Sequence, residues 1–362
     1  MKQKSVVRFL GFQSDNRQSK TCPELCRRIQ NLKWAGLFAI VVALTVCGAR
    51  ADAHQTGKVS RIGFLDQSTA SGMAVLVDAF RKELSNLGWV EGKNIAIEYR
   101  FAEQKPERVP ELAAELVQLK VDLIVVTGAS SASAAKSATT TIPIVMTSAA
   151  NPVGGGLVAS LARPGGNVTG FTAQSVELNT KRLEILKDAV PKLARVGLLR
   201  SSGGGGGGIA LDLQLKELRP AALALKLKLE EIETQADPKG LESAFQTAKQ
   251  KQMGAIMTIP TRPFFAERKR IVELAGKHQL PAIYPQKEFV DEGGLMSYGA
   301  DYDDLFRRAA VYVDKILKGA KPADLPVQQA TKFEFVINLK AAKQIGLTLS
   351  PDFLARANQV IK

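Results

Sequence analysis

The segment IPIVMTSAANPVGGGLVASLARPGGNVTGFT, residues 142–172, has two strand-like ends that enclose two Gly-rich turns. A short helix is predicted to begin at Leu157, between these turns. The pattern Gly154-x-Gly156-x-x-Ala159 follows a strand and precedes that helix, as in a dinucleotide-binding motif. However, Pro164-Gly165-Gly166 ends the predicted helix too early for the crossover of a nucleotide-binding unit. The glycines therefore predict tight turns and close packing rather than a phosphate site.

The same alternation extends to both sides of this segment. Apolar runs of strand length alternate with segments of helical period, first over 59–172 and then again over 173–317. The predicted strands are RIGFLDQ, NIAIEYRF, VDLIVVTG, IPIVMTS and NVTGFT in the first set, and RVGLLRSS, KLEEIET, AIMTIP, PAIYPQ and GLMSYG in the second. This pattern predicts an α/β protein with two Rossmann-like, doubly wound parallel sheets, each covered by helices on both faces.

Residues 1–53 have the features of a signal peptide with a long basic n-region. An unbroken apolar run of 16 residues begins at Trp34, whereas a membrane-spanning helix needs about 20. Small residues at Ala51 and Ala53 provide alternative cleavage sites. Cys47 is not expected to carry a lipid anchor, because Val46 stands where a lipoprotein has a small residue. The mature protein is therefore expected in the periplasm.

Removal of the leader changes the chemistry available to the chain. The leader holds all three cysteines, so the mature chain can form neither disulfides nor thiol-based sites. It also holds nine of the 49 Lys and Arg residues and three of the 35 Asp and Glu residues, which leaves a net charge of +8. These charges are spread along predicted helices among acids, a pattern that argues against a nucleic-acid-binding surface.

The sequence offers little support for an enzyme. TGASSA (127–132) is close to the G-x-S-x-G nucleophile motif and lies at a strand-to-helix turn. A base would have to be His54 or His278, so a secreted hydrolase using Ser130 and His278 is kept as an alternative function. No catalytic residue is assigned. No metal or cofactor is predicted, because the two His residues are far apart and a Walker A motif is absent.

Several motifs resemble the solute-binding components of ABC transporters, some of which take up aromatic amino acids. The motifs are RIGFLDQ, LGWVEGKNIAIEYRFAE, DLIVVTG, the 142–172 segment, LEILKDAVPKLARVGLL, FVDEGGLMSYGADYDDLFRRAAVYVDKILKGAKPADLPV and FEFVINLKAAKQIGL. The resemblance covers nearly all of residues 58–360. It implies a type I periplasmic-binding-protein fold, in which two lobes close around a small-molecule solute. It also implies an inner-membrane permease as partner, and we expect a monomer.

Within that fold, the first lobe is expected to comprise residues 58–172 plus about 300–325, and the second 173–299 plus about 326–362. A three-crossing hinge would lie at 172–174, 299–300 and 326–328. A non-transport ligand sensor of the same fold is a further alternative. The six glycines at 203–208 follow a predicted strand, where a tolerant loop is the simpler interpretation and a flap at the cleft the other.

Ligands of open parallel sheets bind outside the carboxyl ends of the strands. On this basis the ligand-binding residues predicted in the first lobe are Gln67, Ala129, Ser130, Ala149 and Asn151, and those in the second are Ser201, Thr261, Arg262 and Gln286.

Two of these positions depart from the family pattern. Amino-acid-binding members tend to have Asp where this chain has Asn151, and an acidic residue in the loop that holds Thr261 and Arg262 here. A buried ammonium group needs an anionic partner, although Glu288, Asp291 or Asp301 could provide one. Arg262 favours a carboxylate or another anion. The sequence therefore predicts a small polar or anionic organic solute.

Overall fold

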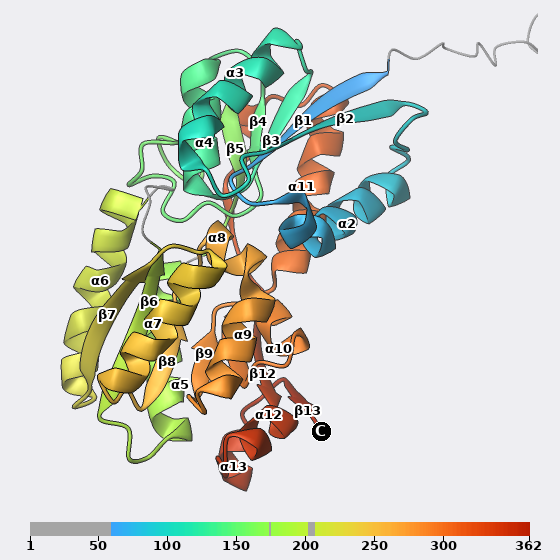
Figure 1. The fold of residues 1–362 in the computed structure, drawn as a ribbon. Coiled ribbons are helices and arrows are strands. Elements are labelled where there is room, and N and C mark those ends of the chain that lie inside the picture. Colours follow the sequence, from blue (N-terminus) through green and yellow to red (C-terminus); the bar gives the residue numbers. More distant parts are fainter. Residues whose placement is uncertain (1–58, 174, 202–206) are drawn as a thin grey trace, which may run out of the picture. The chain divides into compact units, whose positions relative to one another are not determined.

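A computed structural model describes residues 59–173, 175–201 and 207–362 and contains two β-sheets (Figure 1). The six-stranded sheet has the order β11-β5-β4-β3-β1-β2, and the seven-stranded sheet has the order β13-β12-β10-β9-β8-β6-β7. The predicted signal peptide, the cleavage sites at Ala51 and Ala53, Cys47, and glycines 203–206 lie outside the described residues. In the described part of the chain, no helix is both long and apolar enough to cross a membrane.

All strand pairs in the first sheet are parallel. Helices α2 (Ala70–Asn86) and α11 (Tyr302–Leu317) cover one face, and α3 (Val109–Gln118) and α4 (Gly128–Ala138) cover the other (Figure 1). The central strand β3 is therefore buried on both faces and consists of Leu-Ile-Val-Val. The strands are β1 (Ser60–Asp66), β2 (Ile95–Phe101), β3 (Leu123–Val126), β4 (Ile144–Met146), β5 (Val168–Thr172) and β11 (Gln328–Gln329).

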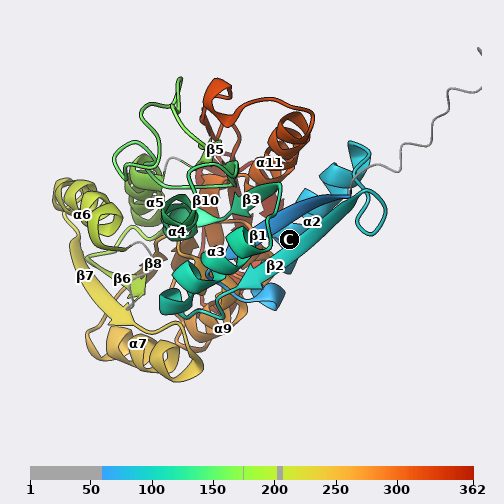
Figure 2. The same cartoon turned by 90° about the horizontal axis from the view of Figure 1, so that it is seen from above.

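In the second sheet, β6 to β10 are parallel to one another, whereas β12 and β13 run parallel to each other and antiparallel to β10. Figure 2 shows α6 (Gly207–Ala224) and α7 (Pro238–Gln250) on opposite sides of β7. The strands are β6 (Arg195–Ser201), β7 (Lys228–Thr234), β8 (Ala255–Thr258), β9 (Ala282–Tyr284), β10 (Met296–Ala300), β12 (Phe333–Asn338) and β13 (Gln359–Ile361). The remaining helices are α5 (Ser175–Ala189), α8 (Arg262–Ala266), α9 (Arg268–Lys277), α10 (Glu288–Asp291), α12 (Leu339–Gln344) and α13 (Pro351–Leu354).

Three connections join the two sheets, and each sheet with its helices is called a lobe below. The chain passes from β5 to α5, from β10 to α11, and from β11 to β12. Helix α11 packs against α2, β4 and β5, so it belongs to the first lobe. The predicted class of two doubly wound lobes is thus confirmed. The last connection follows Gln329, slightly later than expected, because β11 pairs with β5.

Two predicted helices differ from the structure. The helix expected from Leu157 is absent: residues 151–157 form turns, in which the carbonyl of Pro152 accepts the N–H groups of Leu157 and Val158. The sequence also predicts one helix over 264–278, but the structure splits it at Glu267 into α8 and α9. By contrast, a helix over 302–317 with Asp301 as its N-cap is predicted from the sequence, and α11 has these bounds, because Asp301 accepts the N–H of Asp304 at 2.9 Å.

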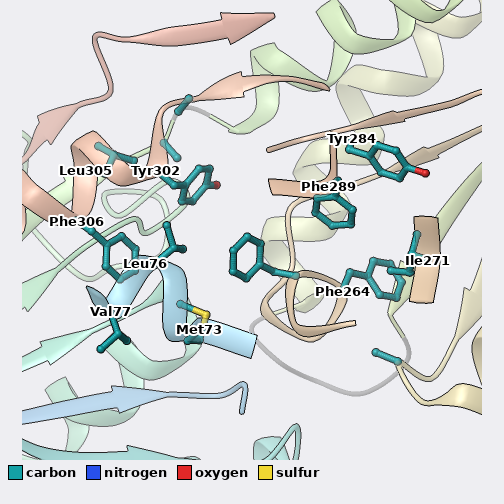
Figure 3. Close-up of a cluster of buried hydrophobic side chains, with 14 of the residues drawn as sticks. Met73, Leu76, Val77, Phe264, Ile271, Tyr284, Phe289, Tyr302, Leu305 and Phe306 are labelled. Carbon is teal, nitrogen blue, oxygen red and sulfur yellow. The ribbon is translucent and has the colours of Figure 1, made fainter. Parts of the chain in front are cut away.

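One apolar cluster contains buried side chains from both lobes (Figure 3). Met73 and Leu76 from α2 and Phe306 from α11 belong to it, as do Phe264 and Phe289 from the second lobe. All five side chains are at most 1% exposed. The lobes in this structure are therefore in contact through closely packed side chains as well as through the connecting segments.

The N-terminus of α2 approaches α8 very closely. A Cβ atom added to Gly72 would lie 2.7 Å from Cβ of Ala266 and 2.8 Å from its Cα. Next to this contact, Nη1 of Arg268 donates to the carbonyl of Gly72 at 2.9 Å. Nε2 of Gln104 donates to Oε1 of Glu267 at 3.1 Å. This inter-lobe contact requires a residue without a side chain at position 72.

Candidate ligand-binding site

Asp66 organises the carboxyl edge of the first sheet at the end of β1. Its Oδ1 accepts the N–H of Ser68 at 2.5 Å, and its Oδ2 accepts the hydroxyl of Thr127, the residue after β3. Burial raises the pKa of the Asp66 carboxyl, and the charge of Arg262 acts in the opposite direction. Asp66 thus ties the ends of two neighbouring strands together.

The hydrogen bond from Thr127 to Asp66 affects helix α4, which begins at the next residue. Thr127 occupies the N-cap position of α4, but its side chain makes no capping hydrogen bond there. The first-turn N–H groups of Gly128, Ala129 and Ser130 therefore lack a side-chain acceptor, and all three residues are partly exposed. Such a helix N-terminus carries a partial positive charge that suits an anion.

Arg262 extends from the second lobe to this edge. It is the first residue of α8, where the hydroxyl of Thr261 caps the helix by accepting the N–H of Phe264 at 3.3 Å. Its Nη2 donates to Oγ of Ser148, which lies just beyond β4, at 3.0 Å. Its Cζ lies 5.3 Å from the ring centroid of Tyr302. The guanidinium therefore bridges the two lobes against an aromatic ring.

Gly128 lies beside the Arg262 side chain. A Cβ atom built on Gly128 would lie 3.9 Å from Cγ of Arg262 and 4.0 Å from its Nε. Arg262 itself is partly exposed, although its Nη1 is enclosed and has no hydrogen-bond partner in the structure. The Arg262 side chain and the uncapped N-terminus of α4 are thus neighbours.

A second guanidinium lies at the connection between β10 and α11. Arg182 on α5 is 1% exposed, and its Nη1 donates to the carbonyl of Tyr298 at 2.8 Å. Its Nη2 donates to Oδ1 of Asn179. Burial lowers the pKa of Arg182 to about 10. Burial raises the pKa of the Tyr302 phenol, and the charges of Arg262 and Arg182 act in the opposite direction.

The carboxyl edge of the second sheet contains buried polar atoms without protein partners. Among the described residues these include Nε2 of Gln286 and Oε1 of Glu288, both in side chains 3% exposed. Burial is the main cause that raises the pKa of Glu288 to about 7. Asp303 and Asp291 raise it further, whereas Lys287 lowers it. Unpaired groups of this kind are typical of functional sites.

The structure places the predicted contact residues in three settings. Ala129, Ser130, Thr261 and Arg262 form one group at the meeting point of α4 and α8, and all are partly exposed. Gln67, Ala149 and Gln286 are buried, and Ser201 is partly buried at the end of β6.

Asn151 is exposed on a turn with φ of +41°, where its Oδ1 accepts the N–H of Gly154 at 2.9 Å. That oxygen is therefore engaged by the backbone, and its contact with a ligand stays a prediction.

Sequence reasoning did not select Asp66, Ser148, Arg182 or Tyr302. Asp66 is the last residue of β1 and Ser148 lies two residues after β4, so the rule for strand ends points to them. Tyr302 follows a predicted crossing, which offers a weaker indication. Arg182 lies in the middle of a helix and carries no such indication, since its burial depends on the packing of α5 against the second sheet.

The alternative pairing of Ser130 with His278 finds no support in the geometry. Ser130 follows β3, at the carboxyl edge of the first sheet. His278 precedes β9, at the amino edge of the second sheet, and its ring stacks on Phe245 at a centroid distance of 6.1 Å. These positions do not form a nucleophile and base pair.

Residues 65–361 match the family model described as ABC transporter substrate binding protein. The chain belongs to this family. This substrate-binding protein is 30% identical over 273 residues to a tyrosine-binding protein of Clostridioides difficile (strain R20291), covering 74% of this chain and 75% of that protein. Its curated relative is thus a binding protein rather than an enzyme.

Solved structures show the same two-lobed architecture. A conserved domain protein from Vibrio cholerae O1 biovar eltor matches with a TM-score of 0.76 and 28% identity, covering 84% of this chain and all of that chain. An ABC domain from Streptococcus pneumonia in complex with L-Trp matches with a TM-score of 0.74 and 26% identity, covering 83% and 99% of the two chains. The substrate-binding protein therefore has the type I periplasmic-binding-protein fold.

Glu288 gives the substrate-binding protein a predicted pH dependence. The folded state holds this proton more tightly than the unfolded state, because burial raises the pKa of Glu288 from 4.5 to about 7. The resulting contribution to the free energy of unfolding is complete below pH 4.5 and is lost as the pH rises through 7. Glu288→Gln does not titrate, so it should not lose this contribution. Between pH 4.5 and pH 8, we expect the free energy of unfolding of wild type to fall by about 2–3 kcal/mol relative to that of Glu288→Gln. Urea unfolding of both proteins at the two pH values measures this, and parallel pH profiles would contradict it.

Proposed function

We propose that the protein is the exported receptor of an ABC importer and binds a small polar or anionic organic solute between its lobes. Ligand binding stabilises the closed form, which an inner-membrane permease recognises before transport. The receptor acts as a periplasmic monomer without a cofactor, and the connections near residues 173, 301 and 331 form its hinge. Ala129, Ser130, Thr261 and Arg262 provide its central ligand contacts, with Gln67, Ala149, Asn151, Ser201 and Gln286 around them.

One observation carries this proposal: Arg262 of the second lobe meets the uncapped N-terminus of α4 in the first lobe. The hydrogen bond from Arg262 to Ser148 links the lobes at the same place. A solute with acceptor oxygens bound here would contact both lobes and favour their closure. The L-Trp complex of the Streptococcus protein supports small-molecule binding in this family, although its ligand is a property of that protein.

A thermal-shift screen tests the receptor function. The protein is heated alone and with amino acids, carboxylates, sugars or nucleosides. A ligand that binds only the native state at about 100 times its Kd is expected to raise Tm by about 5 °C. Isothermal titration of any stabilising compound should then show one site per chain. The absence of a shift with all four classes would contradict the proposed function.

A further inference from the structure

The Arg262 guanidinium lies between the lobes, and among the described residues no carboxylate forms an ion pair with it. It donates a hydrogen bond to Ser148 and makes cation–π contacts with Tyr302 and Phe265, and none of these residues is an acid. Asp66 is the described acid whose charge is affected by Arg262, yet both Asp66 oxygens already accept hydrogen bonds from other groups. The enclosed Nη1 of this partly exposed guanidinium is therefore available to donate a hydrogen bond to an anionic ligand.

Buried hydroxyls at the carboxyl edge of the first sheet supply an independent indication of a ligand. In the described part of the chain, the Oγ atoms of Ser68 and Ser131 and Oγ1 of Thr147 have no hydrogen-bond partner, and each of these residues is 0% exposed. Ser68 follows β1, Ser131 lies on the first turn of α4, and Thr147 directly follows β4. All three therefore belong to the same carboxyl edge as the uncapped N-terminus of α4. Buried hydroxyls without partners are rare unless a ligand or water completes them.

Positive groups adjoin one another at this edge, and among the described residues the acids that act on them or on Tyr302 are Asp66, whose two oxygens already accept hydrogen bonds, and Glu288, whose pKa burial raises to about 7. Arg262 and the N-terminus of α4 adjoin one another, and Arg182 adds a buried guanidinium beside Tyr302. No carboxylate of the described residues forms an ion pair with Arg182, whose contacts are a carbonyl and an amide oxygen. An ammonium group placed here would meet like charges, whereas a carboxylate would meet donors on both lobes.

We propose that the ligand is an organic acid without an α-ammonium group, and that its carboxylate, bound between Arg262 and the N-terminus of α4, is what makes lobe closure favourable. This inference rests on the proposed receptor function and names its ligand class. A carboxylate bound there accepts charged hydrogen bonds from Arg262 on the second lobe and from the N-terminus of α4 on the first, so it adds an attraction between the lobes.

Matched acid pairs test the ligand class. Phenylpyruvate is compared with phenylalanine, indole-3-pyruvate with tryptophan, and 2-oxoglutarate with glutamate, in thermal-shift and calorimetric titrations of the full chain. We expect at least one oxo acid to bind, with an affinity about 10- to 100-fold above that of its amino acid. The proposed ligand class would be overturned if an amino acid bound more tightly than its oxo acid, or if no oxo acid bound. The proposed receptor function would still hold if any other small molecule bound. Equal stabilisation by sodium phosphate would also overturn the carboxylate assignment.

Substitution of Arg262 tests its role. Arg262→Met keeps an unbranched apolar stem and removes the charge, so it is expected to lower affinity for the bound oxo acid about 10- to 100-fold. Arg163→Met removes the same charge from an exposed position and is the matched control, with unchanged affinity expected. Arg262→Lys should restore part of the affinity. Equal affinities of Arg262→Met and Arg163→Met would overturn the assignment.

The closure step is measured separately with spin labels. Cysteines replace Val75 on α2 and Leu223 on α6, which are 46% and 77% exposed, in a chain whose three native cysteines are changed to serine. We expect the oxo acid to shift the wild-type distance distribution toward the closed form. In Arg262→Met, a saturating concentration of the oxo acid should no longer shift the distribution, because no guanidinium remains to bind the carboxylate from the second lobe. A ligand-driven shift in Arg262→Met as large as in wild type would overturn the coupling.

Discussion

Gly299→Ala is expected to destabilise the protein by about 3 kcal/mol or more. A Cβ atom at this position would lie 1.8 Å from the carbonyl oxygen of Pro285 and 2.9 Å from its carbon. These are backbone atoms directly after β9, so relief requires the end of β9 to move away from β10. Because Tyr284 and Gln286 flank Pro285, the substitution should also disturb the carboxyl edge of the second sheet. Urea unfolding gives the change in the free energy of unfolding.

Gly276→Ala is the matched control for this prediction. Gly276 lies in α9, and a Cβ atom there would have no neighbour within 4 Å. An alanine in an open helical position should stabilise the protein by about 0.5–1 kcal/mol, because glycine disfavours helix interiors. Equal stability of the two alanine variants would contradict the close approach of Gly299 to the Pro285 carbonyl.

Gly72→Ala is expected to weaken ligand binding about tenfold or more while reducing the stability of the ligand-free protein far less than Gly299→Ala. The added methyl group would overlap Ala266 of the opposite lobe, at 2.7 Å from its Cβ. Separation of the lobes relieves this overlap, so its cost falls mainly on the closed form. Small-angle X-ray scattering should show a larger radius of gyration than for wild type, and calorimetry with a stabilising compound gives the loss of affinity.

A size exchange provides the control for Gly72. In Gly72→Ala combined with Ala266→Gly, the methyl group of residue 266 is removed and part of the lost affinity should return. Recovery is expected to be incomplete, because Cα of residue 266 would remain 2.8 Å from the new methyl group. An affinity as low as that of Gly72→Ala alone would show that the overlap with Ala266 is not the cause.

Most of the fold follows from local patterns in the sequence. Each predicted strand is present in the structure. Strands of a parallel sheet are covered on both faces, so most of them are recognisable in the sequence as short apolar runs. Helix α11 could be placed to the residue, since the cap at Asp301 and the apolar stripe of the helix agree. The antiparallel direction of β12 was not predicted, because it depends on which strand β12 meets after the third connection.

The failures of prediction involve segments in which local and long-range preferences compete. After Asn151, turns that bond to the Pro152 carbonyl replace the expected helix. At Glu267 the chain needs a break so that α8 can lie against α2 while α9 packs against α7 and α10. Neither arrangement can be read from periodicity, because the deciding partner is distant in the sequence.

The site was predictable to a similar extent. Arg262 and Ser130 were indicated by their positions after strands, and the structure brings their segments together. The contacts that define their surroundings could not be predicted, since Ser148 and Tyr302 approach Arg262 only in the folded chain. The same is true of Thr127, whose side chain bonds Asp66 instead of capping α4. Residue types at strand ends therefore give candidates, whereas their partners depend on tertiary packing.

The placement of β11 and β12 has a consequence for biosynthesis. β11 forms one edge of the first sheet, and β12 lies inside the second, between β10 and β13. Neither sheet is complete until the residues after 327 have left the ribosome, and pairings over such long sequence separations form slowly. In a nascent chain, both lobes therefore lack part of their sheets until synthesis is nearly finished.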